Sequence, residues 1–295
     1  MLMIRIDKSY NFAALTVILW STLATVSKIL LNNIDVMLVL AATSVIASAV
    51  IFLYNLFHGN LNQFRNLTFR EILSICLLGF IGFFLYNWFY LLGIAMIPSQ
   101  QAMIINYLWP ALIIVFSAVL YKERLTYKKI LAVIASLIGI TIVAINGNAH
   151  SLAGGNLNGV IYCLIAAVCY ALYAALNKKQ TYPKELSMFI VFAVTSIISV
   201  LCSIMNGSIG QIAHLNSGMW IGIFYSGIFI NAVGYTSWML ALEYGNTAVI
   251  SNLAYLVPFL SMIFARIVLK EEISIYSIVG IVMIVGGILL QIREA

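Results

Sequence analysis

The sequence carries very little charge for its length. Only 8% of its 295 residues are charged, whereas 63% are hydrophobic, and the mean hydropathy is +1.07. Soluble proteins carry about 25% charged residues. This scarcity excludes a soluble globular fold, because too few polar groups are present to cover a water-exposed surface. No segment between the apolar runs is long enough for a soluble catalytic or nucleic-acid-binding domain.

Clusters of reactive or metal-binding side chains are also missing from the sequence. The histidines stand apart, at His58, His150 and His214, and the four cysteines lie inside apolar segments without a CxxC spacing. This pattern provides no metal site, disulfide framework or catalytic grouping. We therefore expect no catalytic residues, no bound metal and no cofactor, and we expect that the protein is not an enzyme.

Long apolar runs are what the sequence does have. Segments of about 20 apolar residues, the length that crosses a bilayer as a helix, follow one another along the whole chain. The sequence therefore predicts an all-α integral membrane protein with ten transmembrane helices. We expect these helices at 10–31, 36–57, 72–92, 99–120, 128–147, 156–178, 186–204, 217–242, 247–269 and 275–292.

The basic residues predict the orientation of these helices. With a cytoplasmic N-terminus, 12 Lys and Arg residues lie on the cytoplasmic side and 3 on the other, namely Lys28, Arg266 and Lys270. Cytoplasmic loops carry an excess of Lys and Arg. We therefore expect both termini in the cytoplasm and attribute the net charge of +6 to this rule rather than to nucleic-acid binding. We expect Lys28 to extend to the outer lipid headgroups.

The two halves of the chain share a pattern. Tyr107-Leu108-Trp109-Pro110 matches Tyr255-Leu256-Val257-Pro258 at a distance of 148 residues, and at the same distance Lys122-Glu123 matches Lys270-Glu271. We therefore expect two five-helix repeats, at 1–148 and 149–295. Because five is odd, the second repeat is inverted in the membrane. Inverted repeats are typical of secondary transporters, in which the site lies between the halves and opens alternately to each side.

Two matched prolines predict breaks in the fourth and ninth helices. Pro110 and Pro258 each free the carbonyl four residues earlier, those of Asn106 and Ala254. A freed carbonyl at membrane depth needs a polar partner. We interpret the prolines as helix breaks or gating points beside a polar cavity. The alternative is a kink packed against neighbouring helices.

Rings and amides inside the apolar segments are the candidate substrate ligands. Rings stack on planar groups or amines, although many rings in such positions only fill helix interfaces. Uncharged amides suit a neutral or zwitterionic substrate. We expect Trp109, Tyr170 and Asn106 to line one cavity between the halves. The full set of candidates is Trp20, Asn87, Asn106, Tyr107, Trp109, Tyr170, Tyr173, Asn231, Tyr235, Asn252 and Tyr255.

Acidic side chains are almost absent from the apolar segments. The nearest exception is Glu243, at the cytoplasmic end of the eighth segment. An ionisable group at such a depth is a candidate for coupling transport to an ion. The scarcity of acids elsewhere gives no support to proton coupling through a deeply buried carboxylate.

Two motifs resemble a known transporter superfamily. Leu19-Trp20-Ser21-Thr22 and Asn106-Tyr107-Leu108-Trp109-Pro110, with the Lys-Glu pairs after the fourth and ninth segments, resemble the EamA type of the drug/metabolite transporter superfamily. The first two are also similar to the YddG-type aromatic amino-acid exporters. The resemblance covers essentially the whole chain. It implies a basket of ten helices around a central cavity, export of small metabolites, and the bacterial inner membrane.

Several functions remain to be compared. The preferred one is a secondary exporter of amino acids, aromatic ones included, and the alternative is a transporter of another metabolite or drug of the same superfamily. A membrane-embedded lipid enzyme would need acid–base or metal residues that converge at the membrane interface. A receptor or regulatory subunit has no positive sign in the sequence. We expect a small-molecule substrate and the lipid bilayer as partners, no nucleic acid, and a monomer.

Overall fold

The fold consists of helices only within the part of the chain that the structure describes. The computed structural model describes residues 2–122, 126–145, 156–245 and 247–292. Nine stretches in these ranges are long and apolar enough to cross a membrane, and α14 (Ile275–Ile292) adds a tenth, shorter apolar helix. The predicted membrane fold of ten helices is therefore confirmed. The predicted boundary between 148 and 149 lies outside the described residues and stays a prediction.

Each repeat contributes five spans, two of which carry two helix labels each. The first repeat comprises α1 (Leu2–Leu31), α2 (Val36–Phe57), α3 (Phe69–Gly79), α4 (Tyr86–Met96), α5 (Ser99–Asn106), α6 (Trp109–Tyr121) and α7 (Tyr127–Ile145). The second comprises α8 (Asn156–Asn177), α9 (Lys184–Met205), α10 (Ser217–Phe224), α11 (Gly234–Tyr244), α12 (Thr247–Leu253), α13 (Leu256–Phe264) and α14.

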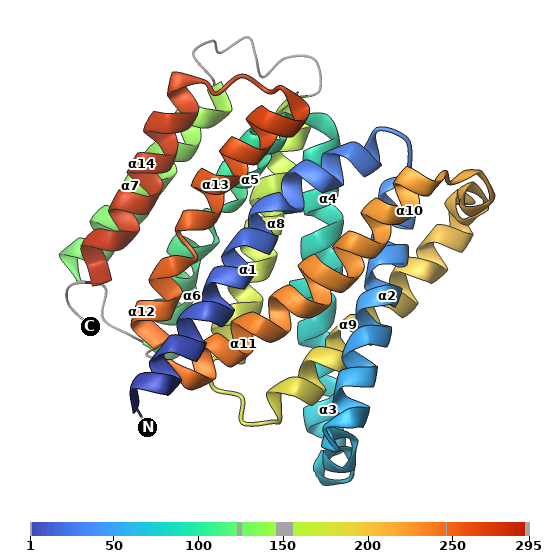
Figure 1. Ribbon diagram of the computed structural model, residues 1–295. Coiled ribbons are helices and arrows are strands. Elements are labelled where there is room, and N and C mark those ends of the chain that lie inside the picture. Colours follow the sequence, from blue (N-terminus) through green and yellow to red (C-terminus); the bar gives the residue numbers. More distant parts are fainter. Residues whose placement is uncertain (1, 123–125, 146–155, 246, 293–295) are drawn as a thin grey trace.

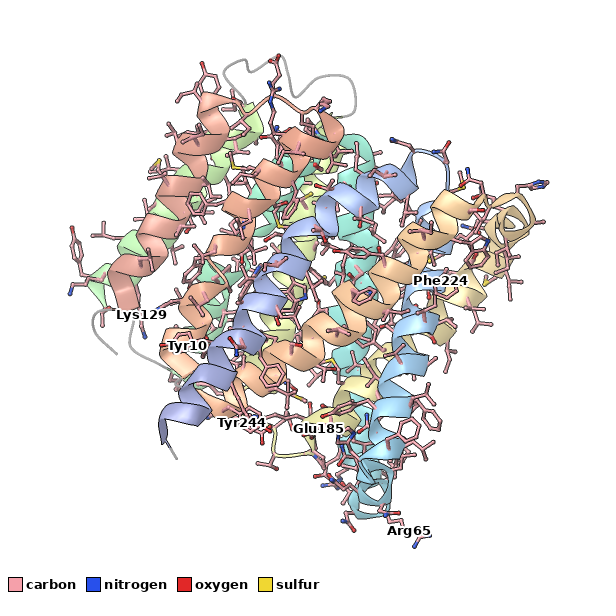
Figure 2. All side chains as sticks on the ribbon, viewed as in Figure 1. Tyr10, Arg65, Lys129, Glu185, Phe224 and Tyr244 are labelled. Carbon is pink, nitrogen blue, oxygen red and sulfur yellow. The ribbon has the colours of Figure 1, made fainter. Side chains whose placement is uncertain are left out.

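The beginning of α1 and the end of α14 lie on the same side of the helix bundle, the lower side in Figure 1. We call this the terminal side and the other the opposite side. Arg65, Glu185 and Tyr244 are labelled on the terminal side in Figure 2. Arg65 belongs to a short 3₁₀ helix, η1 (Asn60–Asn66), that joins α2 to α3. A second one, η4 (Ser208–His214), joins α9 to α10.

The helices α7 and α14 lie side by side at one edge of the bundle (Figure 1) and show the symmetry of the two repeats. A Cβ atom added at Gly139 would lie 2.7 Å from the carbonyl oxygen of Gly280, and one at Gly287 would lie 3.1 Å from that of Ala132. At the repeat distance of 148 residues, Gly139 corresponds to Gly287 and Ala132 to Gly280. Each contact is therefore the symmetry mate of the other, as an inverted pair of repeats requires.

Two spans contain a π-helical segment in the middle. The segment η2 (Phe80–Leu85) joins α3 to α4, and η5 (Tyr225–Val233) joins α10 to α11, so that 69–96 and 217–244 each form one continuous spanning helix. At the repeat distance η2 coincides with the second part of η5. Short π segments inside α-helices are often found at functional sites. The apolar pattern of the sequence does not predict them.

Two other spans are interrupted beside the matched prolines. The helix α5 ends at Asn106 before α6 begins at Trp109, and α12 ends at Leu253 before α13 begins at Leu256. Pro110 and Pro258 lie in the first turns of α6 and α13, where the missing N–H of proline leaves no helical hydrogen bond unmade. The gating role of these prolines stays a prediction.

A charged cap closes the turn between α4 and α5 on the opposite side. Lys28 Nζ donates to the carbonyl oxygens of Ile94, Ala95 and Ile97 at distances of 2.7, 3.1 and 3.0 Å. The expected extension of Lys28 to the lipid headgroups is therefore wrong. A cation is stabilised at a helix C-terminus because the last carbonyl groups have no partner within the helix.

The same turn holds an anion from the second repeat. Glu271 Oε1 accepts from the backbone N–H of Ser99 at 2.8 Å, and Oε2 accepts from that of Gln100 at 3.2 Å. These N–H groups begin α5 and have no partner within the helix. The side-chain amide of Gln100 also donates to the carbonyl of Glu272 at 2.6 Å. The turn between α4 and α5 is thus fixed by one side chain from each repeat.

Candidate functional site

A pocket lies where the interrupted helices, the π segment η5 and α8 meet. Its walls come from α1, α4, α5, α6, α8, η5, α11 and α13, hence from both repeats. We call it the central pocket. Eight of the sequence-predicted residues line it: Trp20, Asn87, Asn106, Tyr107, Trp109, Tyr170, Asn231 and Tyr235.

Aromatic rings form most of the wall of the central pocket. The ring of Tyr170 lies 5.0 Å from that of Tyr86 and 5.1 Å from that of Trp109, measured between centroids. Across the pocket, Trp20 lies 5.0 Å from Tyr235. These separations are in the range of favourable ring contacts. The wall of the pocket thus consists of rings of α1 and α11 and of rings of α4, α6 and α8, which offer apolar faces to a ligand.

Two helix breaks meet beside this pocket. The Tyr107 hydroxyl donates a hydrogen bond to the carbonyl oxygen of Ala254. That carbonyl, which the sequence predicts to be freed by Pro258, also accepts from the N–H of Val257 at 3.0 Å. The carbonyl thus gains its polar partner from the other repeat. Tyr107 itself is 4% exposed, so this bond is shielded from lipid and water.

Two polar atoms of residues that line the central pocket have no protein partner among the described residues. Asn106 Nδ2 donates to Tyr86 Oη at 3.2 Å, but Asn106 Oδ1 is buried and has no partner among the described residues. Trp20 Nε1 is likewise buried and unpaired there. An unmade hydrogen bond of a buried polar group costs about 1–3 kcal/mol. The lining residues of the central pocket thus carry one acceptor and one donor without a partner among the described residues.

The remaining predicted residues lie elsewhere. Tyr173 lines a second pocket instead, whereas neither Asn252 nor Tyr255 lines either of these two pockets. Glu243 is exposed in the last turn of α11. Its coupling role stays a prediction. Glu123, one half of a matched Lys-Glu pair, lies outside the described residues.

Six residues of the central pocket were not predicted. Tyr86 and Tyr90, four residues apart on α4, lie on one face of that helix because residues at this spacing are neighbours. Read together with Asn87, this spacing could have identified them. The other four are apolar and carry no distinguishing signal: Leu23, Met103, Ile230 and Val257.

The second pocket adjoins the central pocket on the terminal side. It shares Tyr170 and Tyr235 with the central pocket and extends to Lys178 and Lys184 beside the loop between α8 and α9. The loop residue Tyr182 also lines it and donates to the side chain of Asn177. Burial raises the pKa of Tyr182 to about 12, so its hydroxyl stays protonated at physiological pH.

Comparison with known proteins identifies the family. The family model described as the EamA-like transporter family matches residues 8–145 and again residues 157–293. The chain belongs to the EamA-like transporter family. This membership confirms the resemblance derived from the sequence motifs and the expectation of a transporter rather than an enzyme.

Relatives of this EamA-like transporter span most of its length. An "Uncharacterized transporter" of Archaeoglobus fulgidus is 24% identical over 78% of the chain and 81% of the relative. The "Aromatic amino acid exporter YddG" of Ancylobacter novellus is 25% identical over 92% of both chains. A solved crystal structure matches with a TM-score of 0.66 over 98% of both chains at 24% identity, which supports the fold alone.

Proposed function

We propose that this EamA-like transporter exports amino acids, aromatic ones among them, by alternating access between its two repeats. The observation that carries the proposal is the combination of rings with two unpaired buried polar atoms, Trp20 Nε1 and Asn106 Oδ1. Rings of this kind stack favourably on an aromatic side chain. The carboxylate of an amino acid accepts from an indole N–H, and an amide oxygen accepts from N–H or O–H donors.

The printed name of one relative supports the same substrate class. The protein of Ancylobacter novellus named as an aromatic amino-acid exporter aligns with this chain over nearly its whole length. Its identity of 25% supports a shared transport mechanism more strongly than a shared substrate. The rings of the central pocket supply the independent reason for aromatic amino acids.

Alternating access is supported by the symmetry between the repeats. The contacts between α7 and α14 relate the two halves, and both helix breaks meet at the central pocket. The second pocket adjoins the central pocket and extends to Lys178 and Lys184 on one side. On the other side, Lys28 and Glu271 fix the turn between α4 and α5. This arrangement fits a state open toward the terminal side.

The terminal side is the cytoplasmic side in this proposal, and the membrane is the inner membrane of a bacterial cell. The excess of Lys and Arg on the terminal side supports the orientation. Labelling of single cysteines by a membrane-impermeant maleimide tests it in intact cells. Gln63→Cys, on η1, should stay unlabelled, and Gln211→Cys, on η4, should be labelled. The reverse pattern would invert the orientation.

Counterflow in proteoliposomes tests the proposed substrate. Vesicles loaded with unlabelled phenylalanine, tyrosine or tryptophan should take up the same labelled amino acid faster than empty vesicles do. Trp20→Phe, which removes the N–H but keeps a ring, should raise the KM by about tenfold, as expected for loss of a hydrogen bond to a charged group. Trp220→Phe, outside the central pocket, is the matched control. Counterflow of other metabolites without any amino acid would refute the substrate class.

A further inference from the structure

A third pocket adjoins the central pocket and contains several hydroxyl groups. It lies between α1, α2, α4, α9 and η5, and shares Leu23, Asn87 and Asn231 with the central pocket. Its hydroxyl groups come from Ser27, Thr43, Ser44, Thr195 and Ser226. We call it the hydroxyl pocket. All five of these residues are buried, and no lining residue, all of them in the described part of the chain, carries a charge.

The hydrogen atoms of several of these polar groups already have acceptors. Thr43 Oγ1 donates to the Val39 carbonyl at 2.8 Å, and Thr195 Oγ1 donates to the Val191 carbonyl at 2.9 Å. A hydroxyl has one hydrogen, so only the lone pairs of these two oxygens remain for a ligand. Asn87 Nδ2 likewise donates to its own helix, to the Phe83 carbonyl at 2.7 Å, and its carbonyl oxygen can still accept.

Ser226 differs from its neighbours in the hydroxyl pocket. It lies in the π segment η5, its side chain is 4% exposed, and its Oγ has no hydrogen-bond partner among the described residues. A buried hydroxyl without a partner is rare in folded proteins unless a ligand or an ordered water completes it. The Ser226 hydroxyl therefore indicates that something polar occupies the pocket during function.

We propose that the hydroxyl pocket binds the ammonium group of a substrate whose aromatic side chain lies in the central pocket. An ammonium group has three donors and no acceptor, which complements a pocket rich in lone pairs. A carboxylate, which only accepts, would face the lone pairs of Thr43 and Thr195, whose hydrogens are already donated to backbone carbonyls. The proposal rests on the proposed function and narrows its substrates to aromatic compounds with a primary amine. Oxygen ligands also suit Na⁺, so the experiment must separate the two cations.

Three ligands that differ by one group each test the inference in purified protein. Phenylalanine carries both charged groups, 2-phenylethylamine lacks the carboxylate, and 3-phenylpropionate lacks the ammonium group. We expect calorimetry in a choline buffer to show binding of phenylalanine and 2-phenylethylamine. The affinity for 3-phenylpropionate should be at least about tenfold lower than that for phenylalanine, because a site built for N–H donors rejects the analogue without them. Equal binding of 3-phenylpropionate, or binding that requires Na⁺, would overturn the inference.

Two substitutions remove acceptors without a large change of shape. Thr43→Val and Ser226→Ala should each lower the affinity for phenylalanine and 2-phenylethylamine severalfold and leave the affinity for 3-phenylpropionate unchanged. Ser136→Ala is the matched control, because Ser136 is buried in α7, donates to the Ala132 carbonyl at 2.9 Å and lines neither pocket. An equal loss of affinity for all three ligands would indicate that Thr43 and Ser226 only pack in the fold, and it would refute the inference.

Binding and counterflow together separate the two proposals. Counterflow of phenylalanine without discrimination in binding would leave the proposed function intact and refute the ammonium subsite. Discrimination that depends on Thr43 and Ser226, without counterflow of any amino acid, would support the subsite and refute amino-acid export. If no amine binds at all, the ammonium subsite is refuted regardless of the counterflow result.

Discussion

Tyr107 and Ala254 join the helix breaks of the two repeats by one hydrogen bond, from the tyrosine hydroxyl to the alanine carbonyl. Tyr107 lies at the break between α5 and α6, and Ala254 lies at the break between α12 and α13. The two breaks are related by the repeat. The bond therefore couples them across the interface of the halves.

Removal of this hydroxyl should destabilise the protein and alter transport. In Tyr107→Phe the Ala254 carbonyl keeps only the bond from Val257, so we expect a loss of about 0.5–1.5 kcal/mol of stability. The melting temperature in detergent should fall by a few degrees, and the rate of counterflow should change. Tyr10→Phe, at an exposed tyrosine of α1, serves as the control. An unchanged melting temperature would show that the hydrogen bond does not contribute.

Loss of the charge at Lys28 should weaken the cap on the turn between α4 and α5. In Lys28→Gln the uncharged amide cannot replace the three hydrogen bonds that the ammonium group donates. A hydrogen bond to a charged group contributes about 1.5–3 kcal/mol to stability. We expect the melting temperature to fall by roughly 5 °C. Arg266→Gln removes an exposed charge on the same side and should have little effect. If both variants melt alike, Lys28 has no capping role.

Substitution of Gly82 should disturb the second pocket. A Cβ atom at this position would lie 2.2 Å from Cγ of Tyr173, so Gly82→Ala must displace that ring or the π segment η2. Overpacking of this kind costs about 1–3 kcal/mol. We expect a lower melting temperature and slower counterflow. Gly286→Ala is the matched control, because a Cβ there meets no atom within 4 Å. Wild-type behaviour of Gly82→Ala would contradict this close contact.

Restoration of helix continuity at Pro258 should slow transport more than it weakens binding. Pro258→Ala supplies an N–H at the start of α13 and favours a straight helix, which opposes movement about the break. We expect a lower maximal rate of counterflow with a nearly unchanged dissociation constant for phenylalanine. Pro183→Ala, at the N-cap of α9, is the control. A loss confined to binding would argue against a gating role.

The spans and their breaks could be predicted because each depends on local sequence. An apolar run of about 20 residues must form a helix in lipid, where every backbone group needs a partner within the chain. Pro110 and Pro258 indicate a break because proline lacks an N–H. The match of Tyr107-Leu108 to Tyr255-Leu256 indicates the repeat, because two such motifs followed at equal distance by Lys-Glu rarely arise by chance.

Other features depend on contacts that local patterns do not reveal. The local sequence around Lys28 cannot show that its side chain lies beside the end of α4, because Lys28 and Ile94 are 66 positions apart. The π segments add a residue to a turn without a distinctive composition, so the rotation that brings Ser226 into the hydroxyl pocket was not predictable. Tyr173, a predicted substrate ligand, lines the second pocket and not the central pocket, and its role stays a prediction.

The contact between α7 and α14 has a consequence for the origin of the chain. Gly139 meets Gly280 as Gly287 meets Ala132, so the surface that each helix offers is complementary to its own inverted copy. A contact of this isologous kind can form between two identical chains as well as within one. A single five-helix unit would therefore already possess the surface needed to pair with a second copy inserted in the opposite direction, and fusion of two such units would preserve it.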